Sequence, residues 1–294
     1  MLPNFLCIGA PKSGTTTLYD VLKQHSDIFL PSFKEPHFFD TQINWEKGID
    51  WYDESYYSNT KKTTLIGDFT PTYLAHPKAP KRIYNSLNKD VKFIVIMRNP
   101  TIRAYSHYLH SCRDNYESLS FEDALSEEKN RLLDLRDENA IIRFGYSLQG
   151  KYAQHLKNYF TKFERKNFFI MTFDEYISDQ KKYTKEILSF LGVPKKKEIN
   201  YNLKSNVASK ARSNKLKNIL KKPSFLKSLA KNMIPSVSLR QKIRNKIQYL
   251  NNKPTLKDPL SLTLKKKIYN EYFKKDINDL EKLLSLNLTI WKYD

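Results

Sequence analysis

A short polar loop near the N-terminus has the composition of an anion-binding turn. The run Gly9-Ala10-Pro11-Lys12-Ser13-Gly14-Thr15-Thr16-Thr17 follows an apolar stretch and precedes apolar residues at helical spacing. A turn from a strand into a helix offers backbone N–H groups and a positive helix end to a phosphate-like group. Its lysine stands before the second glycine, whereas a Walker A loop has the lysine after it. This departure, together with four hydroxyl side chains, favours a 5'-phosphosulfate over a magnesium triphosphate.

A second cation follows another apolar stretch. Residues 93–97 are all apolar, as in a central strand buried on both faces, and Arg98-Asn99-Pro100 comes directly after them. Because proline suits the first turn of a helix, we expect Arg98 between the strand and a helix, at the carboxyl edge of the sheet. Ligands of open α/β sheets bind at that edge. A guanidinium there can hold a phosphate through a forked, charge-assisted contact.

The spacing of apolar residues predicts the elements that position these groups. Strands are predicted at residues 5–9, 64–68, 91–97 and 168–173. Helices are predicted after Pro100 and at residues 15–24, 150–160, 180–191 and 262–284. Such alternation favours a parallel sheet covered on both faces. The predicted fold class is α/β, with a P-loop-like central parallel β-sheet flanked by helices and a basic helical C-terminal part.

Further motifs accompany the loop. They are Lys34-Glu35-Pro36-His37-Phe38-Phe39-Asp40, Asp68-Phe69-Thr70-Pro71-Thr72-Tyr73, Arg98-Asn99-Pro100 with Arg103-Ala104-Tyr105-Ser106, Gly150-Lys151-Tyr152, and Asp258-Pro259-Leu260 with Trp291. Together with the loop, this set resembles the sulfotransferases that use 3'-phosphoadenosine 5'-phosphosulfate (PAPS), particularly their carbohydrate and heparan-sulfate-type branch. The likeness covers most of the chain except roughly residues 215–252.

The resemblance implies a PAPS site that needs no metal and releases adenosine 3',5'-bisphosphate. Lys12 would neutralise charge on the oxygen between phosphate and sulfate, and the loop residues Ser13, Gly14, Thr15, Thr16 and Thr17 would hold the 5'-phosphate. Cofactor contacts are also implied for Arg98, Ser106, Tyr152, Lys210 and Arg212. The last two lie in Lys210-Ala211-Arg212, which is similar to a Lys-Gly-Arg loop of the family with alanine in place of glycine.

Two residues compete for the role of catalytic base. The resemblance implies Glu35, which would take the proton of an acceptor hydroxyl. His37 is the rival, because its ordinary pKa lies nearer neutrality. A packing or capping role beside Phe38 and Phe39 is the alternative for His37. Asp68-Phe69 stands where heparan-type relatives often have a Glu-Lys pair, so their acceptor specificity does not transfer to this chain.

The positive charge is concentrated in one region. The chain has a net charge of +20, and residues 195–275 contain 23 Lys and Arg against 3 acidic residues. Basic amphipathic helices lie on anionic membranes, and a basic surface also attracts an acidic acceptor or is simply solvated. Residues 204–253 therefore predict peripheral contact with an anionic membrane as one interpretation. Nucleic-acid binding is not favoured, because no recognised module accompanies the charge.

The two cysteines, Cys7 and Cys112, form neither a disulfide framework nor a metal-ligand cluster. With no secretory leader and no long apolar run, we expect a cytoplasmic protein, peripheral at the inner face of the membrane if the basic segment binds lipid.

The expected organisation is one sulfotransferase domain over residues 1–294. A PAPS-binding core would cover 1–194, and a basic helical segment with a closing helix would cover 195–294. The expected activity is transfer of a sulfuryl group from PAPS to a hydroxyl or amine of a saccharide or lipid-linked glycan. The alternatives are a P-loop nucleotide kinase or NTPase and a non-catalytic basic protein that binds membranes or nucleic acid.

Overall fold

A computed structural model describes residues 1–58, 60, 65–133, 139–193, 199–201, 203, 209–211, 252–254 and 259–293. The chain divides into two compact units: Met1–Ser205 with Leu260–Asp294, and Asn206–Pro259. Arg212 and most of the basic segment 204–253 lie outside the described residues.

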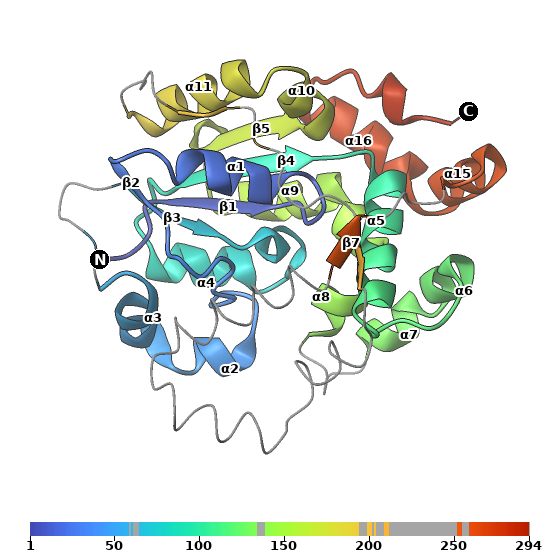
Figure 1. The fold of residues 1–294 in the computed structure, drawn as a ribbon, viewed down its shortest axis with the longest axis horizontal. Helices are drawn as coiled ribbons and strands as arrows, with labels where there is room; N and C mark the ends of the chain where they lie inside the picture. The colour runs from blue at the N-terminus through green and yellow to red at the C-terminus, as the bar shows by residue number, and fades with distance from the viewer. Residues whose placement is uncertain are drawn as a thin grey trace. The chain divides into compact units, whose positions relative to one another are not determined.

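The first unit is built on a five-stranded parallel sheet in the order β2-β3-β1-β4-β5 (Figure 1). The strands are β1 (Phe5–Gly9), β2 (Ile28–Phe29), β3 (Leu65–Phe69), β4 (Lys92–Met97) and β5 (Phe168–Thr172). The predicted α/β class with a P-loop-like parallel sheet is confirmed. The sequence analysis does not predict the short edge strand β2, because two residues are too few to show a periodic pattern of apolar side chains.

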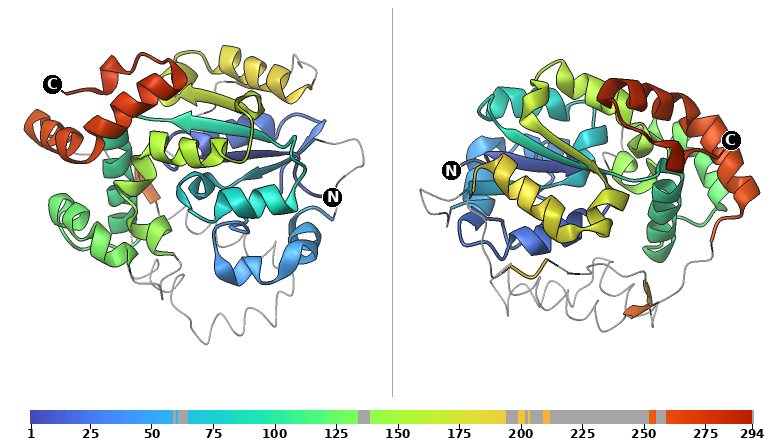
Figure 2. Two further views of the ribbon diagram at one scale, coloured as in Figure 1. Left: turned by 180° about the vertical axis from the view of Figure 1, so that it is seen from behind. Right: turned by 90° about the horizontal axis from the view of Figure 1, so that it is seen from above.

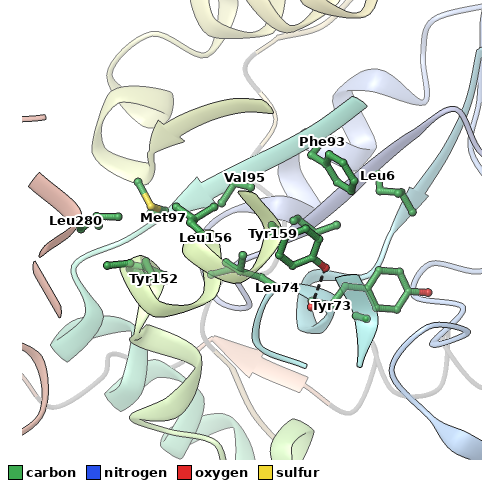
Figure 3. Close-up of a cluster of buried hydrophobic side chains, with 14 of the residues drawn as sticks. Leu6, Tyr73, Leu74, Phe93, Val95, Met97, Tyr152, Leu156, Tyr159 and Leu280 are labelled. Carbon is green, nitrogen blue, oxygen red and sulfur yellow. Dashed lines mark hydrogen bonds between the residues drawn. The ribbon is translucent and has the colours of Figure 1, made fainter. Parts of the chain in front are cut away.

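Alternate residues of the central strands feed two separate hydrophobic clusters. Leu6 of β1 and Val95 of β4 belong to the first cluster, and Cys7 and Ile94 belong to the second. Figure 3 shows the first cluster, in which the Tyr159 hydroxyl donates to the Tyr73 carbonyl oxygen at 3.0 Å. Both central strands are buried on both faces, as the unbroken apolar runs predict.

Helices cover both faces of the sheet. In the right panel of Figure 2, α1 and α11 lie on one side, and α9 and α16 lie on the other. The described helices are α1 (Thr15–Leu22), α2 (Gln42–Trp45), α3 (Gly48–Tyr56), η1 (Pro71–Ala75), α4 (Ala79–Ser86), α5 (Pro100–Arg113), α6 (Phe121–Ser126), α7 (Glu128–Leu132), α8 (Ala140–Phe144), η2 (Leu148–Gly150), α9 (Tyr152–Phe160), η3 (Arg165–Asn167), α10 (Phe173–Ser178), α11 (Gln180–Leu191), α15 (Leu262–Ile268), η4 (Tyr269–Phe273), α16 (Lys274–Leu284) and η5 (Thr289–Trp291). In the part of the chain that the structure describes, no helix has the length and apolar character needed to cross a membrane.

Local sequence explains where the principal helices begin and end. Asn99 caps α5 by accepting from the backbone N–H groups of Thr101 and Ile102, and Pro100 occupies the first turn. Gly192 ends α11 in the left-handed region, with φ of 83°. These are the boundaries that the sequence predicts.

The last predicted helix is divided. Residues 262–284 form α15 and α16, separated by the π-helical turn η4. Phe273 of this turn packs against Gly150, where an added Cβ would lie 2.9 Å from Phe273 Cε1. The periodicity predicts helix throughout this range, but a local pattern contains neither the π turn nor this tertiary contact.

In the second unit, β6 (Ser209–Ala211) pairs antiparallel with β7 (Asn252–Pro254). The backbone of Lys210 lies opposite that of Lys253.

Candidate active site

The polar loop connects the end of β1 to the start of α1. Gly14, in the left-handed region with φ of 87°, is the N-cap of α1, and among the described residues no side chain caps this helix. The first turn consists of threonines and contains no acidic residue. An anion would therefore meet the positive end of the helix with no carboxylate in the helix's own first turn.

Burial changes the charge state of the loop cation. Burial, assisted by the positive charge of Arg113, lowers the pKa of Lys12 to about 7, although the negative charge of Glu35 acts in the opposite direction. Lys12 has a φ of 68°, a left-handed conformation that is uncommon for a residue with a side chain. An anion at the loop would favour the charged form of Lys12.

Arg98 and Lys12 are brought together at the carboxyl edge of the sheet. The Arg98 Nη1 atom donates to the Lys12 carbonyl oxygen at 3.1 Å, and the Arg98 guanidinium carbon lies 4.6 Å from the centre of the Phe173 ring. Phe173 also lies under the loop, because a Cβ on Gly14 would approach its Cε2 atom to 2.9 Å. One aromatic ring thus supports both cationic motifs.

The other predicted phosphate-binding residues have different surroundings. The fully buried Tyr152 hydroxyl donates to the Arg98 carbonyl oxygen at 2.8 Å and accepts from the Arg98 N–H at 3.3 Å, so its contacts are with the backbone of Arg98. Ser106 is half-buried on α5, about two turns after the start of that helix. Lys210 belongs to the second unit, whose placement against the first is not described, and Arg212 lies outside the described residues.

The acidic motif folds into a compact hydrogen-bonded turn. His37 Nδ1 lies 3.0 Å from Asp40 Oδ2, and His37 Nε2 lies 3.7 Å from Glu35 Oε2. Thr72 donates to the same Asp40 oxygen. Burial alone would lower the pKa of His37, but the hydrogen bond and charge of Asp40, with the charge of Glu35, outweigh burial and raise it. His37 is therefore oriented between two carboxylates, beyond any packing against its phenylalanine neighbours.

Lys34 joins this turn to the loop. Its Nζ atom donates to Thr16 Oγ1 at 2.9 Å and to Glu35 Oε1 at 3.1 Å. Sequence reasoning gave no role to Lys34 or Asp40, although both stand in the motif quoted around Glu35. The signal was present, since a cation and a carboxylate flank the two candidate bases.

The buried carboxylate of Asp68 is linked to the acidic turn by hydrogen bonds. Asp68, at the end of β3, accepts hydrogen bonds from Tyr52 at 2.5 Å, Thr70 at 2.6 Å and Tyr73 at 3.0 Å. The Tyr73 hydroxyl also accepts from the Phe38 N–H at 3.0 Å. Burial raises the pKa of Asp68 to about 6, although these hydroxyl donors act to lower it. Asp68 thus fixes the backbone beside His37 through one intervening tyrosine.

Residues near the C-terminus form hydrogen bonds with the segments that follow β4 and β5. The Asn99 side-chain amide donates to the Tyr293 hydroxyl at 3.1 Å, and the Trp291 indole N–H donates to Asp174 at 3.3 Å. Trp291 is almost completely buried. The end of the chain therefore contributes to the arrangement at the ends of β4 and β5.

The described residues contain no group of three or more His, Cys, Asp or Glu side chains placed to hold a metal ion. The ionisable groups at the carboxyl edge instead combine three cations, Lys12, Lys34 and Arg98, with the carboxylate of Glu35 and the imidazole of His37. This arrangement can bind a phosphorylated anion beside a group that accepts a proton.

Comparison with known proteins identifies the family of this chain. The family model described as sulfotransferase domain matches residues 2–255. Heparan sulfate glucosamine 3-O-sulfotransferase 3B1 of Mus musculus is 31% identical over 193 residues, which cover 65% of this chain and 46% of that protein. Membrane-associated sulfotransferase kil1 of Dictyostelium discoideum is 36% identical over 135 residues, covering 43% of this chain and 28% of that protein.

The chain spans about half the length of the first of these relatives and less of the second. A solved structure, the sulfotransferase from Alicyclobacillus acidocaldarius, is similar in fold, with a TM-score of 0.67, 24% identity and 99% coverage of both chains.

The Asp68 network predicts a specific dependence of stability on pH. Because the pKa of Asp68 rises from 3.8 to about 6 on folding, its proton is held more tightly in the folded state. This group should therefore lower the free energy of unfolding as the pH rises from about 4 to about 6, by on the order of 2–3 kcal/mol. In Asp68→Asn, the free energy of unfolding should not show this decrease. Urea denaturation of both proteins across this range measures it, and parallel curves for the two would contradict the prediction.

Proposed function

Because this chain belongs to the sulfotransferase domain family, we propose that it transfers the sulfuryl group of PAPS to a hydroxyl or amine of a saccharide-containing acceptor by in-line displacement. The observation that carries the proposal is the contact between Arg98 and Lys12 at the ends of neighbouring strands, next to Glu35. A saccharide acceptor is supported by the relatives named heparan sulfate glucosamine 3-O-sulfotransferases.

The loop and the end of β4 are suited to the two ends of this nucleotide. The uncapped start of α1, with Lys12, Ser13, Gly14, Thr15, Thr16 and Thr17, would hold the 5' end. Arg98 would hold the 3'-phosphate, with Ser106 beside it and Tyr152 acting through the Arg98 backbone. Lys210 and Arg212 remain proposed contacts within a single sulfotransferase domain over residues 1–294. PAPS would supply a sulfuryl group already activated by its phosphate leaving group, and this chemistry requires no metal.

A residue of the acidic turn would accept the proton of the acceptor hydroxyl. Glu35 is proposed to accept the proton of the hydroxyl as its oxygen bonds to sulfur, while His37, held by Asp40, orients Glu35 from the other side. Lys12 would neutralise the oxygen that leaves sulfur, which remains on the 5'-phosphate of adenosine 3',5'-bisphosphate. Positioning and charge stabilisation would supply most of the rate.

Ligand preference tests the proposal against a kinase or NTPase. We expect adenosine 3',5'-bisphosphate to raise the melting temperature more than magnesium ATP does, because the loop lacks the Walker lysine and Arg98 serves a second phosphate. Thermal denaturation with each ligand measures this. A larger shift with magnesium ATP would overturn the sulfotransferase proposal.

The reaction itself is tested with labelled PAPS and heparan sulfate oligosaccharides, the acceptor class in the names of the relatives. Glu35→Gln should lower kcat by about 10²–10⁴-fold while binding of adenosine 3',5'-bisphosphate persists. Glu54→Gln, at an exposed position on α3, is the matched control. If Glu35→Gln keeps full activity and His37→Asn loses it, His37 is the base.

The lowered pKa of Lys12 predicts proton uptake on nucleotide binding. Below pH 7 Lys12 already carries its charge, so this group adds no pH dependence; above pH 7 it must gain a proton to meet the anion. Affinity for adenosine 3',5'-bisphosphate should therefore fall by up to about tenfold per pH unit between pH 7 and 9. Titration calorimetry in buffers of different ionisation enthalpy measures the uptake. The Lys12→Arg variant should take up no proton when the nucleotide binds. Proton uptake by this variant equal to that of the unmodified protein would contradict the assignment.

The basic segment 204–253 remains a proposed contact with an anionic membrane, which would hold a cytoplasmic enzyme at the inner face, near a lipid-linked glycan. Its lysine and arginine content is the support for this proposal. We expect sedimentation with phosphatidylserine-containing vesicles but not with phosphatidylcholine vesicles at physiological salt. Equal sedimentation with both would reject electrostatic membrane binding.

A further inference from the structure

Lys34 lies between the anion-binding loop and the proposed base. Its ammonium group contacts Thr16 Oγ1 of α1 at 2.9 Å and Glu35 Oε1 at 3.1 Å, so one side chain connects two segments that are 18 residues apart. The Lys34 side chain is only 16% exposed, and that of Glu35 is 39% exposed. A lysine that is largely withdrawn from water and makes two such contacts differs from an ordinary surface ion pair.

Charge repulsion creates a need for such a group. A carboxylate base and a nucleotide carrying phosphates and a sulfonate repel each other, and the repulsion grows where water is excluded. Lys12 lies within electrostatic range of Glu35, but its pKa of about 7 leaves it only partly charged before an anion arrives. The Lys34 ammonium is in direct contact with the carboxylate of Glu35.

We propose that Lys34 is a positioning residue that links the nucleotide-binding loop to Glu35 and holds the carboxylate aimed beside the anion. The proposal rests on the function proposed above. Lys34 acts through its two partners, Thr16 and Glu35, and needs no contact with the nucleotide.

The direction of the hydrogen bonds makes the link sensitive to the ligand. Because the Thr16 hydroxyl oxygen accepts from Lys34, its own hydrogen is available for donation to an anion at the loop. An anion that accepts from Thr16 would polarise this hydroxyl and strengthen the bond from Lys34. Binding of an anion at the loop would thereby affect Glu35 through the two hydrogen bonds that Lys34 donates.

Glu35 also faces other ionisable groups, which the test must keep constant. His37 Nε2 lies 3.7 Å away with Asp40 behind it, and the charges of Glu35 and Lys12 act on each other. Arg113 and Asp114, paired at 3.1 Å near the end of α5, act on Lys12 in opposite directions. Substitutions at Lys34 leave all five of these side chains in place.

The experiment compares charge removal with charge retention. At fixed pH, adenosine 3',5'-bisphosphate should shift the NMR resonance of the Glu35 carboxyl carbon in the unmodified protein, and most of this response should be lost in Lys34→Met. Lys34→Arg should keep most of the response, because a cation is retained. Lys47→Met is the matched control: Lys47 is exposed and donates to Asn44, and its removal should leave the response unchanged.

Kinetics separate positioning from binding. Lys34→Met should lower kcat at least tenfold, while the Kd for adenosine 3',5'-bisphosphate stays within about threefold, because the loop amides and Arg98 are untouched. If Lys34→Met is too unstable to study, Lys34→Gln, which keeps a polar side chain without the charge, takes its place.

The outcomes distinguish this inference from the function on which it rests. A response of the Glu35 resonance to the nucleotide that is unchanged in Lys34→Met overturns the link, whatever the activity. Equal loss of nucleotide binding and of kcat in Lys34→Met would make Lys34 a binding residue and also overturn it. An unmodified protein that binds no adenosine 3',5'-bisphosphate and transfers no sulfuryl group refutes the proposed function, whatever the Lys34 variants show.

Discussion

The hydrogen bond from the Arg98 guanidinium to the Lys12 carbonyl oxygen is the contact on which the candidate site depends. It joins the loop after β1 to the end of the neighbouring strand β4, so neither motif can move alone. Phe173 supports both partners, packing on Gly14 and on the guanidinium. Because this contact joins two neighbouring strand ends and Phe173 follows a third, the spacing between the two cations proposed to bind the nucleotide is set by the sheet, whose geometry varies little.

Long-range hydrogen bonds keep that arrangement in place. Asp68 reaches the acidic turn through Tyr73, and Asn99 reaches the C-terminal residues, which are 192 positions away at Trp291. Three hydroxyl donors restrain the buried carboxylate, because moving it would break hydrogen bonds in a place where water does not replace them. Asp68 and the C-terminal segment therefore serve the site as well as the stability of the fold.

The strands, the loop and the position of Arg98 could be predicted, because they follow from local patterns: apolar runs, a glycine turn and a proline at a helix start. Local patterns do not reveal which side chains meet across elements. Lys34 stands beside Glu35 in the sequence, but its second partner, Thr16, lies on another helix. The π turn at Tyr269–Phe273, where Phe273 packs against Gly150, is likewise absent from the local pattern. Sequence thus predicts the frame of the site, whereas its hydrogen-bond network depends on tertiary contacts.

Backbone strain is concentrated at the residues proposed to do the chemistry. Lys12, Glu35 and His37 have φ of 68°, 65° and 52°, conformations that cost about 1 kcal/mol or more each for residues with side chains.

Two of these strained residues have their carbonyl oxygens held by side chains from elsewhere. Arg98 donates to the carbonyl of Lys12, and Thr41 and Asn44 donate to that of His37 at 2.7 and 3.1 Å. Charge-assisted and partly buried hydrogen bonds of this kind offset the strain. The left-handed turns are therefore fixed before any ligand binds. A site organised in this way spends little binding energy on ordering its own backbone, and more of that energy is available to bring the anion and the base together.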